Sequence, residues 1–202
     1  MKTLFIFISL FLSANLFHFS ENKNDQSKNP TCISDNEKAL YHAVNEYRGE
    51  HNLTPIPLST SLTIVAQTHV RDLVENEPFD NAGNCNPHSW SDQGSWKSCC
   101  YNSGKDGECM WNKPRELTSY DSDGYEIVMQ WFNESKPNEN VSAEDALQTW
   151  KKSTSHNNVI LNKGMWKSSE WNAVGVGIYH GFAAIWFGTI PDSAGEPDIC
   201  EN

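Results

Sequence analysis

Basic residues are scarce in this sequence. The chain of 202 residues carries 15 Lys and Arg side chains against 26 Asp and Glu, which gives a formal net charge of −11 with neutral histidines. A protein with this balance repels polyanions, because the phosphate backbone attracts proteins mainly through positive charge. The composition therefore argues against nucleic acid as a partner.

Long hydrophobic runs are also missing after the first residues, and a membrane-spanning helix needs about 20 of them. One apolar run, at residues 4–12, follows Lys2 and precedes small residues, which is the pattern of a secretory signal peptide. We expect residues 1–20 to be removed by cleavage between Ala14 and Ser20, which lowers the net charge to −12 because Lys2 is lost. The mature protein should be soluble and secreted, either extracellular or, in a Gram-negative bacterium, periplasmic.

Pairs of cysteines with C-x-x-C spacing are absent, which disfavours a zinc site made of thiolates. Behind an export signal, the six cysteines indicate up to three disulfides, among 15 conceivable pairings. We favour a bond between Cys32 and Cys200, at the two ends of the folded part, with the other four bracing a local loop. A bond that closes so long a loop stabilises by roughly 4–5 kcal/mol. The cysteines are Cys32, Cys85, Cys99, Cys100, Cys109 and Cys200.

Three segments have apolar residues at helical spacing. The first opens with a capping box at residues 34–37 and continues to Gly49, and the third opens at Ser142 and reaches Trp150. The second spans residues 62–73 and carries His69 on its apolar face. A lone histidine in this position is usually a hydrogen-bonded core residue, and we interpret His69 in this way.

The other segments complete a mixed pattern. We expect residues 21–31 to be a flexible leader and residues 81–120, rich in cysteine and tryptophan, to be an ordered loop within one domain at 32–202. Residues 124–132 fit either a short strand or a helix. Residues 174–178 and 182–189 predict an antiparallel hairpin, and the glycines at 175 and 177 allow another element or a ligand to approach the backbone closely. The fold class is therefore α+β, with helices covering an antiparallel sheet.

Between residues 36 and 190, several motifs occur in an order that resembles the secreted CAP superfamily, also called the SCP family, and within it the bacterial-type branch. The resemblance implies an α-β-α sandwich with a central antiparallel sheet flanked by helices. The matching residues are Leu40 to Arg48 with the prolines at 55 and 57, Ala66 and His69, the pair His88 and Ser89, the segment from Trp150 through His156 to Leu161, and Val174 to Gly177.

The resemblance also implies a cleft with two histidines and usually two acidic residues, in which the histidines can hold a divalent metal ion, often zinc. By motif match these histidines are His88 and His156. Two neutral imidazoles, a carboxylate and water would form an open zinc site. Its affinity would fall below roughly pH 6.5, where the imidazoles gain protons.

The acidic half of the cleft departs from the family pattern. The Gly-Glu-Asn motif of the family has its nearest counterpart at residues 124–127, where Glu126 is displaced by one position. Glu116 is a second candidate, and we favour Glu126. At the position of the second family glutamate, near Trp150, this chain has Lys or Ser. The four-residue site is therefore incomplete, which weakens a catalytic interpretation.

These observations favour a secreted, disulfide-stabilised CAP-domain protein that acts as a binding or effector module without turnover. The resemblance implies a sterol, a fatty acid or an extracellular protein as partner, and zinc or another divalent cation as cofactor. One alternative is a metal-dependent, peptidase-like hydrolase with His88 and His156 as ligands and Glu126 as base. Another is a purely structural extracellular domain in which both histidines are hydrogen-bonded packing residues.

Overall fold

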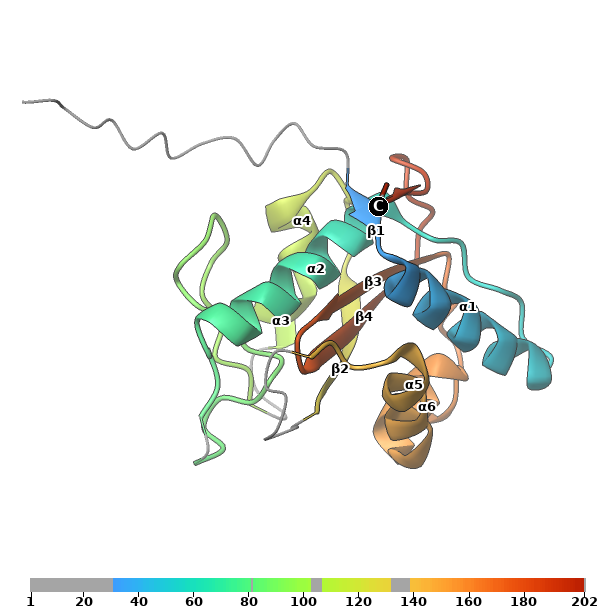
Figure 1. The fold of residues 1–202 in the computed structure, drawn as a ribbon, viewed down its shortest axis with the longest axis horizontal. Coiled ribbons are helices and arrows are strands. Elements are labelled where there is room, and N and C mark those ends of the chain that lie inside the picture. Colours follow the sequence, from blue (N-terminus) through green and yellow to red (C-terminus); the bar gives the residue numbers. More distant parts are fainter. Residues whose placement is uncertain (1–30, 81, 103–106, 132–138, 202) are drawn as a thin grey trace, which may run out of the picture.

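The computed structural model describes residues 31–80, 82–102, 107–131 and 139–201. The expected signal peptide lies outside these residues, as do residues 21–30 of the expected leader and residues 81 and 103–106 of the expected loop. At the centre lies a three-stranded antiparallel sheet in the order β2-β4-β3 (Figure 1). Its strands are β2 (Gly124–Gln130), β3 (Ala173–Tyr179) and β4 (Phe182–Gly188).

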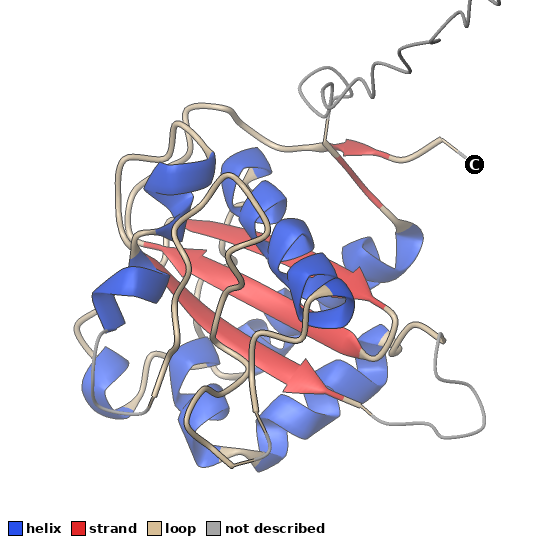
Figure 2. Ribbon diagram, turned by 90° about the vertical axis from the view of Figure 1, so that its left-hand side faces the viewer, coloured by secondary structure: helices blue, strands red, loops and turns tan. Residues whose placement is uncertain are grey.

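Helices cover both faces of this sheet (Figure 2), so the chain has the expected α-β-α arrangement. On one face lie α1 (Asp35–Glu50), α5 (Ala143–Lys152) and α6 (Thr154–Ile160), and on the other lies α2 (Thr60–Glu75). Each face has its own hydrophobic core, and the strands contribute alternate residues to the two. The segment from Trp150 to Leu161 is not one continuous helix, because α5 ends at Lys152 and α6 begins at Thr154.

The local signals explain where the helices begin. Ser34 caps α1 in a complete capping box with Glu37, and the side chains of Ser59 and Ser142 cap α2 and α5. Residues 124–130, for which the sequence allowed a strand or a helix, form strand β2. These residues form a strand because β4 pairs with β2 along its whole length, from Gly124 opposite Gly188 to Gln130 opposite Phe182. The pairing supplies hydrogen-bond partners for the backbone groups of β2.

Two glycines of β3 let α2 lie directly on the sheet, as the sequence predicted. A Cβ atom added at Gly175 would be 2.0 Å from the backbone carbon of Leu62, and one at Gly177 would be 2.5 Å from that of Ala66. Both distances are far below van der Waals contact, so any larger residue would push the helix away. This close packing places His69, further along α2, against the same face of the sheet.

Three disulfides close the fold, and the expected bond between Cys32 and Cys200 is one of them. It accompanies a small parallel pair, β1 (Cys32–Ile33) with β5 (Asp198–Ile199), which the sequence did not predict. The bonds Cys85–Cys100 and Cys99–Cys109 brace the long loop. That loop is less irregular than expected, because it holds α3 (Gly107–Trp111) and α4 (Lys113–Leu117).

One further short element, the 3-10 turn η1 (Gly164–Trp166), follows α6. No helix in the described part of the chain is both long and apolar enough to cross a bilayer.

Candidate functional site

The centre of the candidate site is a buried carboxylate on the strand β2. Glu126 points to the side of the sheet covered by α2, and its side chain is completely buried. One carboxylate oxygen contacts Nδ1 of His69 and the other accepts a hydrogen bond from Nδ1 of His88 at 2.7 Å. A buried carboxylate needs partners of this kind to remain ionised. Both oxygens of Glu126 are therefore engaged by histidines.

His69 is the partner that sequence analysis interpreted as a core residue only. It is fully buried on α2, and its Nε2 donates to the backbone oxygen of Ser89 at 2.9 Å. Because a carbonyl oxygen only accepts, Nε2 carries a proton, and the contact between Nδ1 and Glu126 holds a second one. The ring also stacks on Trp90, with centroids 4.2 Å apart and planes within 6°. This stacking fixes the orientation of the His69 ring.

The electrostatics of Glu126 agree with this arrangement. Burial by itself raises the pKa of the carboxyl, but the charges and hydrogen bonds of His69 and His88 outweigh it and lower the pKa to about 2. Glu126 is thus ionised at neutral pH and forms a buried ion pair with His69. With Nδ1 of His88 donating to this carboxylate, the lone pair of neutral His88 lies on Nε2.

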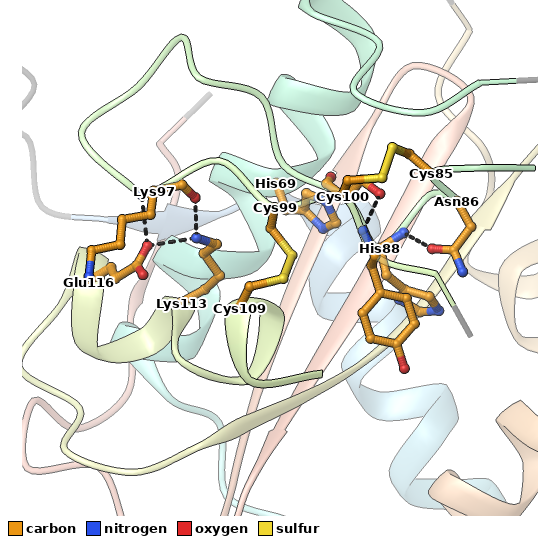
Figure 3. Close-up of a disulfide and its surroundings, with 12 residues drawn as sticks. His69, Cys85, Asn86, His88, Lys97, Cys99, Cys100, Cys109, Lys113 and Glu116 are labelled. Atoms are coloured by element: carbon orange, nitrogen blue, oxygen red, sulfur yellow. Dashed lines mark hydrogen bonds and ion pairs between the residues drawn. A yellow bond between two sulfur atoms is a disulfide. The ribbon is translucent and has the colours of Figure 1, made fainter. Parts of the chain in front are cut away.

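The braced loop holds His88 in place. Cys85 is bonded to Cys100 three residues before it, and the backbone of Trp90 pairs with that of Cys99 two residues after it. The backbone N–H of His88 donates to Oδ1 of Asn86 at 3.0 Å. Its side chain keeps 19% of its surface exposed, so it is the member of the histidine–carboxylate cluster that reaches solvent. Figure 3 shows His88 beside the Cys85–Cys100 bond.

His156 is a residue of helix α6. Burial lowers its pKa, the charge of nearby His88 lowers it further, and Glu126 acts in the opposite direction. His156 is therefore electrostatically coupled to the His88–Glu126 pair. Its Nδ1 atom is buried and has no hydrogen-bond partner, which is unusual for a polar atom. A ligand or water at this nitrogen would satisfy it.

Glu116, the second acidic candidate, lies elsewhere. Its carboxylate binds Nζ of Lys113 at 2.6 Å and the backbone N–H of Lys97 at 3.0 Å. Figure 3 shows this group on the far side of the Cys99–Cys109 disulfide from His88. Glu116 therefore neutralises the charge of the buried Lys113 ammonium group. Of the two carboxylates, the structure brings only Glu126 together with a predicted histidine.

The donor set allows a two-histidine metal site and disfavours a larger one. In the described ranges, no three His, Cys, Asp or Glu side chains gather closely enough to hold a metal ion. Each oxygen of Glu126 already accepts from a histidine, so the carboxylate would support a metal-bound His88 through Nδ1. His88 and His156 offer Nε2 and an unpartnered buried nitrogen respectively. Neutral imidazole nitrogens of this kind are chemically suited to bind a metal ion such as zinc.

Comparison with solved structures finds extracellular and surface proteins of bacteria. An outer surface protein from Borrelia burgdorferi matches 80% of this chain and 98% of its own, at 15% identity and a TM-score of 0.50. An extracellular protein with an SCP domain from Bacillus anthracis has 20% identity, coverage of 75% of this chain and a TM-score of 0.49. A cysteine-rich secretory protein from Staphylococcus aureus has 16% identity, coverage of 84% and a TM-score of 0.47.

The likeness to these structures concerns the fold, since their sequences are distant. The chain spans only 39% of the Bacillus protein and 42% of the Staphylococcus protein. Comparison with curated proteins finds no match. The model of the family described as "CAP: Cysteine-rich secretory protein family" matches residues 41–181, which is more than half of the chain and includes His69, His88, Glu126 and His156. The chain therefore belongs to the CAP, or cysteine-rich secretory protein, family.

Proposed function

We propose that this chain is an extracellular CAP-domain protein that works as a binding module, with a cleft on His88 and His156 that takes a divalent metal ion. The observation that carries the proposal is the double use of Glu126. Because His69 and His88 occupy both of its oxygens, the carboxylate fixes the His88 ring and is not free to act as a base. Three disulfides support an oxidising, extracellular location.

The residues of the cleft have separate tasks in this proposal. Glu126 holds His88 in the tautomer with the proton on Nδ1, which leaves the lone pair of Nε2 available to a metal ion. His69 compensates the charge of Glu126 inside the protein, which keeps the carboxylate ionised. His156 contributes a nitrogen that burial keeps neutral to lower pH than usual. A bound zinc ion would supply a Lewis-acidic centre for an electron-rich group of a ligand.

A hydrolase built on the same cleft is the weaker candidate. Catalysis of this kind needs a nucleophile or a water molecule beside a general base. Among the described residues, no hydroxyl or thiol forms a hydrogen bond with Nε2 of His88, and Glu126 is already committed to two histidines. His88 itself, oriented by Glu126, is the group that would have to act as base. Turnover of peptides or esters that disappears in His88→Ala but persists in His42→Ala would favour this candidate.

Metal titration tests the shared cleft. We expect isothermal titration of the wild type at neutral pH to show one zinc ion per chain. His88→Ala and His156→Ala should each weaken binding by more than about 100-fold, since each removes one of two protein ligands, whereas changes that only disturb a ligand's support cost about 10–100-fold. Binding should weaken as the pH falls, because an imidazole binds metal only without its second proton, and burial lowers the pKa of His156, so that its nitrogen remains available to lower pH than an ordinary imidazole.

The control for this titration is His42→Ala, because His42 is exposed on α1 and away from the cleft. It should bind zinc as the wild type does. Equal binding in the wild type and in both cleft variants would contradict the proposal, and so would equal losses in all three histidine variants.

A further inference from the structure

Positive charge is concentrated in one part of this acidic chain. Residues 146–169, which we call the basic segment, contain four lysines and no Asp or Glu, although the whole chain has 26 acidic residues against 15 basic ones. Lys151 and Lys152 end α5, and Lys163 and Lys167 flank η1. The last three of these lysines are exposed. The basic segment can therefore face an anionic surface that the rest of the protein would repel.

An exposed apolar side chain lies in the middle of this charge. Met165 has 83% of its surface in water, the largest exposure of any large hydrophobic residue in the described part of the chain. Lys163 lies two residues before it in the sequence, and Lys167 lies two residues after it. Single exposed hydrophobic residues are common and need no explanation by themselves. The rigid construction of the turn and the flanking charge distinguish this one.

The turn that presents Met165 is fixed at its base. The backbone N–H of Lys163 donates to the carbonyl of Asn158 at 2.8 Å, and Nδ2 of Asn162 donates to the carbonyl of Ser169 at 2.9 Å. The buried guanidinium of Arg48 in turn donates to Oδ1 of Asn162 at 2.7 Å. The turn therefore has a set position before any partner binds, which lowers the entropic cost of binding.

Trp166 anchors the same turn on its inner side. Its ring lies 5.0 Å from that of Tyr125 and 5.5 Å from that of Trp171, measured between centroids. With Trp166 held inward, the adjacent Met165 projects into solvent. Two aromatic contacts of Trp166 and the hydrogen bonds at the base of the turn therefore hold one exposed apolar residue between two lysines.

We propose that the turn 163–167 docks on the surface of an anionic lipid bilayer. Met165 enters the boundary between headgroups and acyl chains, while Lys163 and Lys167 contact the negative headgroups. The pairing of an apolar tip with flanking lysines fits this boundary, where long cationic side chains extend to the headgroups. A soluble polyanion would use the lysines and leave Met165 in water, and a protein partner would need a wider apolar area than one side chain.

The expected binding is weak, reversible and sensitive to salt. Each lysine near an anionic membrane contributes a factor of about five to the partition constant, and this effect decays within roughly 8 Å at physiological salt. The excess negative charge of the rest of the chain limits the binding to the orientation in which the basic segment faces the lipid. Docking does not depend on metal, so it can succeed or fail independently of the His88–His156 cleft.

Co-sedimentation with lipid vesicles tests this proposal. The protein for it is purified from the medium into which the expressing cells secrete it. Wild-type protein should bind vesicles with about 30% phosphatidylserine, and bind pure phosphatidylcholine vesicles at least about 10-fold more weakly. Lys163→Glu should reduce binding by at least about 10-fold, whereas Lys38→Glu on α1 changes the net charge equally and should have little effect. Met165→Ser should reduce it severalfold, whereas Ile199→Ser, at 47% exposure, should not.

The outcomes are distinguishable. All four positions lie at least partly on the surface, and unchanged thermal unfolding would show that the variants fold. His88→Ala should lose metal and keep vesicle binding, which separates this proposal from the proposed function. Equal binding to both vesicle types, equal losses in the variants and their controls, or binding to heparin without binding to vesicles would each overturn it.

Discussion

Replacing Glu126 with glutamine is expected to lower the free energy of unfolding by about 3–5 kcal/mol at pH 7, the range for breaking a buried ion pair from one side. An amide offers one acceptor oxygen and one donor group, whereas His69 and His88 both donate to the carboxylate. One histidine must therefore lose its partner, and the charge of His69 loses its compensation. Urea unfolding measures the difference directly.

The matched control is Glu46→Gln, an exposed position on α1. It should change the free energy of unfolding by no more than about 0.5 kcal/mol. Glu126→Gln should also weaken zinc binding by roughly 10–100-fold, because His88 loses the group that orients it. If Glu126→Gln were as stable as Glu46→Gln, the buried ion pair would not exist as described.

In Glu126→Gln, the free energy of unfolding should also depend less on pH than in the wild type. The folded pKa of Glu126, about 2, is lower than its ordinary value of 4.5. Its contribution is therefore complete above about pH 4.5 and is lost as the pH falls towards 2. The wild type should lose stability through this window more steeply than Glu126→Gln. The free energy of unfolding of Glu126→Gln should still fall somewhat at low pH, because other carboxyls, such as that of Asp192, also have lowered pKa values.

A second large effect is expected at Gly175. In Gly175→Ala the new methyl group would lie 2.0 Å from the backbone carbon and 2.2 Å from the backbone oxygen of Leu62. Backbone atoms of a helix cannot move aside as a flexible side chain can, so α2 must shift away from β3. We expect a loss of at least about 3 kcal/mol, at the upper end of overpacking effects.

Gly49→Ala is the matched control for this change. Gly49 lies in α1, and a Cβ atom there would meet nothing within 4 Å. Alanine should stabilise the helix at this position by roughly 0.5–1 kcal/mol. The two variants should therefore move the unfolding temperature in opposite directions. A Gly175→Ala protein that unfolds at the wild-type temperature would contradict the close packing of α2 on the sheet.

The main elements of the fold were predictable because their signals are local. Capping serines, helical spacing and the paired glycines of β3 each depend on a few neighbouring residues. The β1–β5 pair was not predictable, since two residues at each end of the chain carry no periodicity. Strand β2 was ambiguous because seven mostly buried residues fit either type of element.

The site was less accessible to sequence analysis than the fold. The motif match proposed His88, His156 and Glu126, but not that Glu126 lies between two histidines. His69 was assigned to the core, and its place there is confirmed. Its link to Glu126 depends on how α2 packs on the sheet, which no local pattern encodes. The available signal was a titratable residue on an otherwise apolar helix face, which needs a partner when buried.

In the proposed site, Glu126 forms hydrogen bonds with His69 and His88 and does not bind the metal ion itself. A crystal structure of the protein grown with zinc tests this most directly. We expect zinc to be bound by His88, His156 and water, with Glu126 still hydrogen-bonded to His69 and His88. A zinc ion bound to Glu126, or histidines that do not share a zinc ion, would contradict it.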